Sequence, residues 1–419
     1  MAGSAALRED AHAMQDELAQ LRHRLHRRPE VGLQLPRTQE TVLEALDGLP
    51  LEITTGEALT SVTAVLRGGR PGPAVLLRGD MDALPVQEET GFDFTSEVDG
   101  VMHACGHDLH TAMLVGAARL LSAHRDELAG DVVFMFQPGE EGYDGAGKML
   151  AEGVLDAAGT RVSSAYGMHV MSSAIPPARF VTRPGPLMAA ADELRVVVRG
   201  AGGHGSAPHP ARDPISVAAQ LVGDLQTLIT RRFNAFDPVV LTVGSFHAGT
   251  MRNIIPDEAR FQATVRSFSV AAREQMRVES VRLCESVAAA YGMDVDAQYL
   301  EEYPVTVNDA DHAAFAAGVA ADVFGDQRYA PMVHPQTGAE DFSRVLAAVP
   351  GCYLFLGAAM GEDWQTAPNN HSPRARFSDS VLSDGVLLHA ELAVRALERD
   401  SAGAAGGAVG GSSRQFTGK

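Results

Sequence analysis

Residues 131–142 read DVVFMFQPGEEG. An unbroken apolar run that is rich in Val and Phe and ends at Pro-Gly is typical of a short strand buried on both faces. Two adjacent glutamates, Glu140 and Glu141, follow the strand directly. Open α/β sheets bind their ligands beyond the carboxyl ends of the strands. The stretch therefore predicts both a covered sheet and a functional site at its edge.

Similar runs lie on both sides of this strand along the chain. PAVLLRG (73–79), SSAYGMHV (163–170) and CYLFLG (352–357) are short, apolar and bounded by Gly or Pro or by polar residues, as buried strands are. HTAMLVGAARLLSAH (110–124) has the apolar period of a helix, and residues 9–46 carry long helical stretches. Alternating strands and helices predict an α/β fold with a mostly parallel mixed sheet flanked by helices.

The pattern changes in the middle of the chain. The predicted elements there are the strand 193–200, the helix 213–233, the strands PVVLTVGSF and EARFQATVRSF, the helix 269–292 and the strand 293–303. This β-α-β-β-α-β order is typical of a ferredoxin-like α+β unit, which can fold as an insertion.

Three regions of the chain follow from these elements. We expect one domain of residues 1–189 plus 303–400 and an inserted domain of residues 190–302. The tail, residues 401–419, consists largely of Gly, Ala and Ser. It has little to bury, so we expect it to be disordered.

Composition excludes several classes of partner. The chain has 34 Lys and Arg against 53 Asp and Glu, a formal charge of -19, which disfavours nucleic acid and anionic membranes. No run approaches the roughly 18 apolar residues of a spanning helix, and the first 30 residues lack the apolar segment of a signal peptide. We therefore expect a cytoplasmic protein. The three cysteines are odd in number and far apart, which argues against a disulfide framework.

The segment MHACGHD (102–108) holds the first candidate ligands. Cys105 and His107 flank one glycine, so both side chains can reach a common point. They lie just before a helix, whose positive N-terminal end favours the thiolate. Such a pair suits Zn, Mn, Co or Ni. A buried free cysteine is the alternative, because Cys is among the most buried residue types.

Further candidates stand in other segments. Of Glu140 and Glu141, one is expected to ligate metal and the other to act as general base; a solvated residue and a helix cap are the alternative. His169 in GMHV and His371 in NNHSP add two imidazoles, although each alone is more often structural. Asp82 in GDMDALP fits the role of orienting a ligating histidine, and capping of a turn is the alternative for this residue.

The inserted domain adds three polar candidates. His204 lies in the Gly-rich stretch GAGGHGSAPH, where a mobile lid can present an imidazole to an oxyanion. A solvated turn residue is the alternative for His204. Asn253 and Arg266 are candidates for holding a substrate carboxylate, since Arg offers a planar fork of donors.

Eight motifs together resemble a known family. RGDMDALP, MHACGHDLHTA, FQPGEEG, GMHV, GGHGSAPH, NIIPD, GAEDF and NNHSP follow the order found in hippurate hydrolases, N-acyl-amino-acid amidohydrolases and plant auxin-conjugate hydrolases. This amidohydrolase subfamily belongs to the larger aminoacylase and glutamate carboxypeptidase family of two-metal hydrolases. The resemblance extends from about Leu21 to Arg399. It implies a zinc-exopeptidase-like fold whose inserted domain serves as lid and dimerisation domain.

The resemblance also implies an activity and its residues. The activity is metal-dependent hydrolysis of the linear amide of an N-acyl amino acid, which releases a carboxylic acid and a free amino acid. The implied metal ligands are Cys105, His107, Glu141, His169 and His371. Glu140 is implied as general base and Asp82 as the residue that orients a ligand. His204 is implied to reach the active site of the partner subunit in a homodimer, and Asn253 and Arg266 to hold the substrate carboxylate.

Two positions depart from the wider family. There, the residue aligned with Asp80 is a metal-binding histidine, and the residue aligned with Cys105 is a carboxylate that bridges two metals. We therefore expect one or two divalent ions per subunit. For Asp80 itself, capping of a turn remains an alternative to a role in the site.

Three rival functions remain open. A dipeptidase or aminopeptidase on the same scaffold needs a carboxylate that faces the substrate amine, and the sequence does not place one. A non-catalytic metal-dependent binding protein needs no general base, so the Glu140 and Glu141 pair argues against it. A papain-like cysteine hydrolase would use Cys105 with a nearby histidine.

Overall fold

The computed structural model describes residues 4–407, and their contacts divide the chain into two compact units. The first unit contains the chain up to residue 185, together with residues 308–333 and the chain from residue 344 onward. The second unit contains residues 186–307 and 334–343. Each unit has a sheet and a hydrophobic core of its own.

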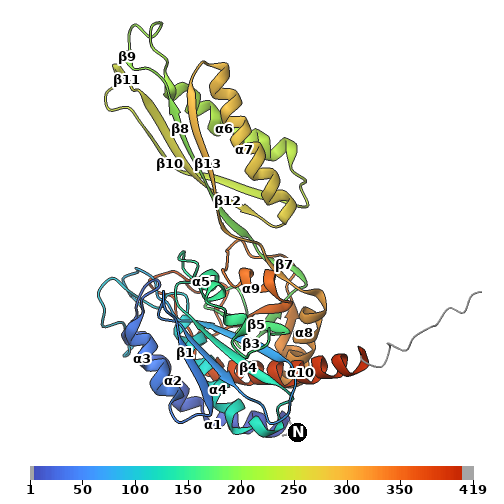
Figure 1. The fold of residues 1–419 in the computed structure, drawn as a ribbon. Helices are drawn as coiled ribbons and strands as arrows, with labels where there is room; N and C mark the ends of the chain where they lie inside the picture. Colours follow the sequence, from blue (N-terminus) through green and yellow to red (C-terminus); the bar gives the residue numbers. More distant parts are fainter. Residues whose placement is uncertain (1–3, 408–419) are drawn as a thin grey trace, which may run out of the picture. The chain divides into compact units, whose positions relative to one another are not determined.

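The first unit is built on an eight-stranded mixed sheet (Figure 1). In spatial order its strands are β1 (Leu51–Thr55), β2 (Val62–Leu66), β4 (Asp131–Gln137), β3 (Ala74–Asp80), β5 (Ser164–Met171), β16 (Gly351–Gly357), β6 (Phe180–Thr182) and β15 (Tyr329–Pro331). The central strands β4, β3, β5 and β16 are parallel, whereas β1, β2 and β4 pair antiparallel. The mostly parallel centre explains why these strands are buried along almost all of their length, since both of their faces are covered.

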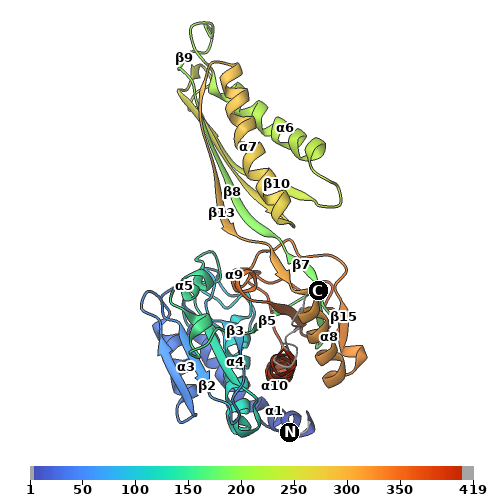
Figure 2. The ribbon, with the colours of Figure 1, turned by 45° about the vertical axis from the view of Figure 1, so that its right-hand side comes forward.

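Helices flank this sheet (Figure 2). They are α1 (Ser4–Ala13), α2 (Gln15–Arg27), α3 (Pro36–Leu46), α4 (His107–Ala123), α5 (Gly145–Ala151), α8 (Ala310–Phe324), α9 (Ser343–Ala348) and α10 (Leu382–Gly407). Short 3-10 turns span Arg125–Glu127, Val154–Asp156, Asp326–Arg328 and Asp379–Val381. α4 contacts α2, α10 and β3 and is buried along almost all of its length. The core of the unit therefore surrounds the helix that begins at the MHACGHD segment.

The second unit is a four-stranded antiparallel sheet with the helices α6 (Pro214–Arg232) and α7 (Val270–Ala290) packed against it. The strand order is β10 (Val239–Ala248), β12 (Glu258–Ser267), β8 (Ala190–Arg199) and β13 (Asp294–Tyr303). This order of a β-α-β-β-α-β chain is the ferredoxin-like arrangement. Asp213 and Ser269 cap α6 and α7 with their side chains, as N-cap residues do.

Two further pairs of short strands complete the second unit and its connection. β9 (Gly203–His204) pairs antiparallel with β11 (Ile254–Ile255). β7 (Gly185–Met188) pairs with β14 (Thr306–Asn308), where the chain enters and leaves the unit. In β12 the residues alternate between buried and exposed, because one face of the sheet lies against the helices and the other does not.

The structure confirms the predicted fold class, including the mostly parallel sheet flanked by helices and the ferredoxin-like unit. The expected disorder of the tail is wrong for residues 401–407, which extend α10. An Ala-rich segment can continue an existing helix without the cost of nucleation, and the Ser401 hydroxyl donates to the Leu397 carbonyl at 2.7 Å. Residues 408–419 of the predicted tail lie outside the described residues. Among residues 4–407, no helix combines the length and the apolar character needed to span a membrane.

Gly106 fixes the start of α4. Its φ of +85° is left-handed, a conformation that glycine adopts at little cost. A Cβ atom at this position would lie 2.5 Å from Val170 Cγ2 and 3.1 Å from the Phe377 ring. The backbone between Cys105 and His107 therefore needs glycine for two independent reasons, conformation and space.

We predict that Gly106→Ala lowers the free energy of unfolding by about 2–4 kcal/mol, through left-handed strain and overpacking together. Gly153→Ala is the matched control, since Gly153 has a φ of +86° and no atom within 4 Å of its added Cβ. This control should cost only about 1 kcal/mol, from strain alone. Urea denaturation of the full chain measures both values. Equal losses in the two variants would show that the contacts with Val170 and Phe377 are unimportant.

Candidate metal centre

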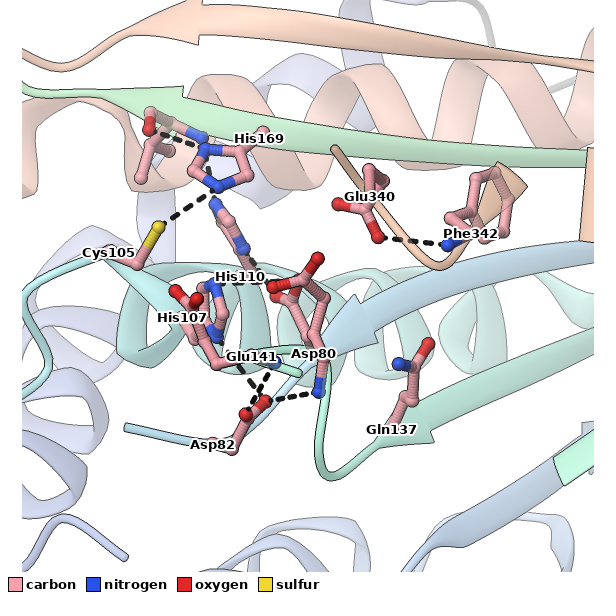
Figure 3. A network of polar contacts seen from close by, with 12 residues as sticks. Asp80, Asp82, Cys105, His107, His110, Gln137, Glu141, His169, Glu340 and Phe342 are labelled. Carbon is pink, nitrogen blue, oxygen red and sulfur yellow. Dashed lines mark hydrogen bonds and ion pairs between the residues drawn. The ribbon is translucent and has the colours of Figure 1, made fainter. Parts of the chain in front are cut away.

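Polar side chains converge at one edge of the central sheet (Figure 3). Asp80 is the last residue of β3, Glu140 and Glu141 follow β4, and His169 lies near the end of β5. These strands are parallel neighbours, so their carboxyl ends meet at the same edge. The loop after β16 adds His371, and the loop before α4 adds Cys105.

The structure brings the candidate ligand atoms into overlapping groups. In each group, the ligand atoms lie within 4.8 Å of one another. The groups are Cys105 with His107 and His169, Cys105 with Glu141 and His371, and His107 with Glu140 and Glu141. All five predicted ligands and the predicted base are therefore neighbours, although they come from four separate segments of the chain.

Cys105 and His169 approach each other directly. The Cys105 Sγ atom lies 3.3 Å from His169 Nε2, and His169 Nδ1 lies 2.7 Å from the Val170 carbonyl. A carbonyl only accepts, so Nδ1 carries the proton and Nε2 presents its lone pair toward the sulfur. Burial, together with His110 and His107, holds the pKa of His169 well below its usual range. His169 is therefore a neutral imidazole, the form that binds metal.

Glu141 and His371 form the side of the group nearest to solvent. His371 Nε2 lies 2.9 Å from Glu141 Oε1, and 54% of the His371 side chain is exposed. Hydrogen bonds with Cys105 and Glu141 raise the pKa of His371 to about 10. Burial opposes ionisation of Glu141, but His371 and His107 outweigh it and lower the pKa of that carboxyl.

His107 lies between two carboxylates. Its Nδ1 atom is 3.5 Å from Asp82 Oδ1, and its Nε2 atom is 3.7 Å from Asp80 Oδ2. Within the described part of the chain, neither buried ring nitrogen makes a well-aligned hydrogen bond. Burial disfavours the imidazolium, yet Asp80 and Cys105 raise the pKa of His107 well above its usual range.

These observations fit a divalent cation. The buried nitrogens of His107 need a partner, and the carboxylates and the sulfur around them attract positive charge. Sulfur, imidazole and carboxylate together form a donor set for a first-row transition metal or zinc. The residues that would hold it are Cys105, His107, Glu141, His169 and His371.

Asp82 is hydrogen-bonded to the glutamate pair. Its Oδ1 atom accepts from the Glu140 backbone N–H and its Oδ2 atom from the Glu141 backbone N–H, each at 3.0 Å. Figure 3 shows Asp82 below His107 with these bonds. One carboxylate thus fixes the turn that carries both glutamates, so that Glu141 faces Cys105 and His371 while the buried Glu140 lies beside His107.

Sequence reasoning left Asp80 open and missed Arg78. Arg78 Nη1 donates to Asp80 Oδ2 at 2.6 Å inside β3, and His110 Nδ1 lies 2.5 Å from Asp80 Oδ1. Asp80 therefore does not cap a turn. His110 Nε2 accepts from the Val170 N–H at 2.8 Å, so both nitrogens of His110 are already bonded. An arginine within the apolar run PAVLLRG was the available signal, since a buried cation needs a partner.

The second unit places its three candidates in two locations. His204 and Ile254 are paired in the β9–β11 ladder, and the Gly205 N–H donates to the Asn253 carbonyl at 2.8 Å, so His204 and Asn253 are close. Arg266 lies near the other end of β12. From Glu258 to Arg266 the strand extends roughly 25 Å at 3.3 Å per residue. Within one subunit, Asn253 and Arg266 therefore cannot hold the same carboxylate.

Comparison with known proteins assigns the chain to a family. The Peptidase family M20/M25/M40 matches residues 76–395. Thermostable carboxypeptidase 1 of Saccharolobus solfataricus is 38% identical over 93% of this chain and 98% of its own length. N-acetylcysteine deacetylase of Bacillus subtilis is 36% identical, over 92% of this chain and 98% of its own length.

Solved structures agree with the sequence relatives. The YxeP protein of Bacillus subtilis, a dinuclear metal binding peptidase, superposes with a TM-score of 0.79 at 34% identity. The match covers 92% of this chain and 99% of that one. These similarities extend over both units of the chain, and the metal-binding groups described above lie within the matched region. The chain belongs to the Peptidase family M20/M25/M40, in its amidohydrolase subfamily, and is a metal-dependent hydrolase.

Proposed function

We propose that this enzyme hydrolyses the amide bond of N-acyl amino acids and releases a carboxylic acid and a free amino acid. The observation that carries the proposal is the contact of Asp82 with the backbone N–H groups of both Glu140 and Glu141, which holds the two glutamates in different positions. These bonds place Glu141 in a group with Cys105 and His371, and the buried Glu140 in a group with His107. We assign Glu141 as the metal ligand and Glu140 as the base. The similarity to an N-acetylcysteine deacetylase supports an N-acyl amino acid as substrate.

The proposed mechanism assigns each step to a residue. A divalent cation held by Cys105, His107, Glu141, His169 and His371 would lower the pKa of a water toward neutrality, as in the best-known zinc site. Glu140 takes a proton from the attacking water, and the hydroxide that forms adds to the amide carbonyl carbon. Glu140 then returns the proton to the nitrogen as the C–N bond breaks, which releases the amino acid. Asp82 keeps the Glu140 carboxylate in place through the backbone. His204 donates a hydrogen bond to the carbonyl oxygen as negative charge develops there.

Glu140→Gln should lower kcat by about 10²- to 10⁴-fold, the usual contribution of a general base, while the metal content stays at the wild-type level. Glu141→Gln at the neighbouring position is the matched comparison and should lose metal. Metal analysis and turnover of an N-acyl amino acid, measured on the same samples, separate the two roles. Wild-type turnover in Glu140→Gln would refute the assignment of the base.

A substrate panel tests the proposed reaction against its rivals. We expect N-acetyl, N-benzoyl and indole-acetyl amino acids to be cleaved faster than dipeptides with a free α-amino group. Chelators should abolish activity, and Mn²⁺ or Zn²⁺ should restore it. Faster cleavage of dipeptides would favour the peptidase alternative, which the carboxypeptidase relative supports. Activity that survives chelation but not thiol alkylation would favour a cysteine hydrolase.

We further propose that the active enzyme is a homodimer in which His204 serves the site of the partner subunit. Two observations support this. Asn253 and Arg266 are too far apart in one subunit to hold one carboxylate. The His204 ring is exposed, and its Nδ1 atom binds the Ser206 hydroxyl at 2.8 Å, so Nε2 is available to a ligand from outside the subunit.

Mixed dimers test this arrangement. Glu140→Gln and His204→Ala subunits, co-expressed with different tags and purified as heterodimers, should regain about half of the wild-type rate, because one of the two equivalent sites has both residues. Each variant alone should be slow. If His204 acts within its own subunit, the heterodimer has no complete site and stays slow. A monomer in solution would contradict the proposal directly.

A further inference from the structure

The side chain of Asn370, next to His371, connects three of the metal-binding segments. Its Nδ2 group donates to the Cys105 carbonyl at 3.2 Å and to the Val170 carbonyl at 3.0 Å. It also lies 3.8 Å from the Cys105 sulfur, within reach of a weak N–H···S bond. Its Oδ1 atom accepts from the Ser172 backbone N–H and hydroxyl, both at 2.9 Å.

The partners of Asn370 determine how its amide is oriented. Two backbone carbonyls only accept, and the Ser172 backbone N–H only donates. The NH₂ group must therefore face Cys105 and Val170, and the oxygen must face Ser172. The opposite orientation would oppose oxygen to oxygen and nitrogen to N–H. The amide thus has one allowed orientation, with its positive end toward the Cys105 sulfur.

The Val170 carbonyl links Asn370 to His169. It accepts from Asn370 Nδ2 and also lies 2.7 Å from His169 Nδ1. This carbonyl sets the tautomer of His169 and directs Nε2 toward the Cys105 sulfur. A shift of the carbonyl would therefore move the nitrogen that His169 offers to metal.

His371 depends on the same loop. Its backbone has a φ of +70°, which costs a non-glycine residue about 1 kcal/mol or more unless other contacts hold it. The His371 N–H donates to the Ala104 carbonyl at 2.8 Å, directly before Cys105. Asn370 and this backbone bond together fasten the strained residue to the cysteine loop.

We propose that Asn370 is a positioning residue for the metal centre. It holds Cys105, His169 and His371 in one arrangement and directs the N–H side of its amide toward the Cys105 sulfur. The proposal rests on the ligand roles proposed above. Partners that orient metal ligands typically contribute about 10- to 100-fold to metal affinity, and an N–H donor to sulfur also changes how strongly the thiolate donates electrons to a metal.

Asn370→Asp and Asn370→Ala test the proposal in cobalt-loaded, full-length protein. Asp keeps the acceptor for Ser172 but replaces the donor with an anionic oxygen that faces the Cys105 sulfur, and Ala removes both. In both variants, the free chelator concentration that removes half of the bound Co²⁺ should be about 10- to 100-fold lower than in the wild type. The sulfur-to-cobalt charge-transfer absorption should shift or weaken, which a general loss of stability would not cause.

Asn369→Ala is the matched control. Asn369 is the preceding residue, and its side chain bonds Ser173 but neither Cys105 nor Val170. The Asn369→Ala protein should bind Co²⁺ with the affinity of the wild type and should show the same charge-transfer band. Unchanged or higher affinity with an unchanged band in both Asn370 variants would overturn the positioning role. If the Asn370→Asp protein folds poorly, the Co²⁺ affinity and the absorption band of Asn370→Ala alone decide whether Asn370 is a positioning residue.

Cys105→Ser separates this inference from the assignment of ligands. The wild-type protein should show the charge-transfer band, and Cys105→Ser should not. If the wild-type protein lacked the band, Cys105 would not be a ligand. That result would contradict the proposed metal site itself, whatever the Asn370 variants do. If the band is present and depends on Cys105, the behaviour of the Asn370 variants tests Asn370 alone.

Discussion

Concentrated negative charge at the carboxyl ends of the central strands is the constraint on which the site depends. Asp80, Asp82, Glu141 and the sulfur of Cys105 surround His107, which is fully buried. Such a group is stable only with compensating positive charge. Arg78 compensates Asp80, and the two backbone N–H groups of the glutamate turn compensate Asp82. The remaining charge is left for the imidazoles and a divalent cation to balance, which is why we propose the metal site at this point.

Much of the fold could be predicted from the sequence, because the central strands of the first unit are largely apolar and β12 of the second unit alternates between buried and exposed residues. β4 and the second unit's β13 follow their predicted ranges closely. The strands β1, β2, β6 and β15 were missed. β6 and β15 have only three residues each, which leaves no periodic signal. Helix α10 continues past Ser401 because a long packed helix precedes the Ala-rich segment. The composition of the tail alone does not reveal that a preceding helix can extend into it.

The candidate site was predictable as a set of residues but not as an arrangement. Family motifs named all five candidate ligands and Glu140, and the structure places them together. The contacts of Asp82 with backbone N–H groups, and those of Asn370 with carbonyls, were not predictable from the sequence. Nearly every residue has a backbone N–H and a carbonyl, so the residue types do not show which of them a side chain binds. The separation of Asn253 from Arg266 was missed. The number of residues between them gives a distance only once it is known that most of those residues form an extended strand.

The strand order also determines when the site can exist during synthesis. β16 ends at Gly357 and lies between β5 and β6, although both of those strands precede the second unit in the chain. A nascent or truncated chain that stops before β16 already carries four of the five candidate ligands, yet the strand that bears His169 has an open edge. Such edges recruit other chains. An incomplete product is therefore a target for aggregation or proteolysis, and the full set of five candidate ligands exists only in molecules whose translation has passed the last strand.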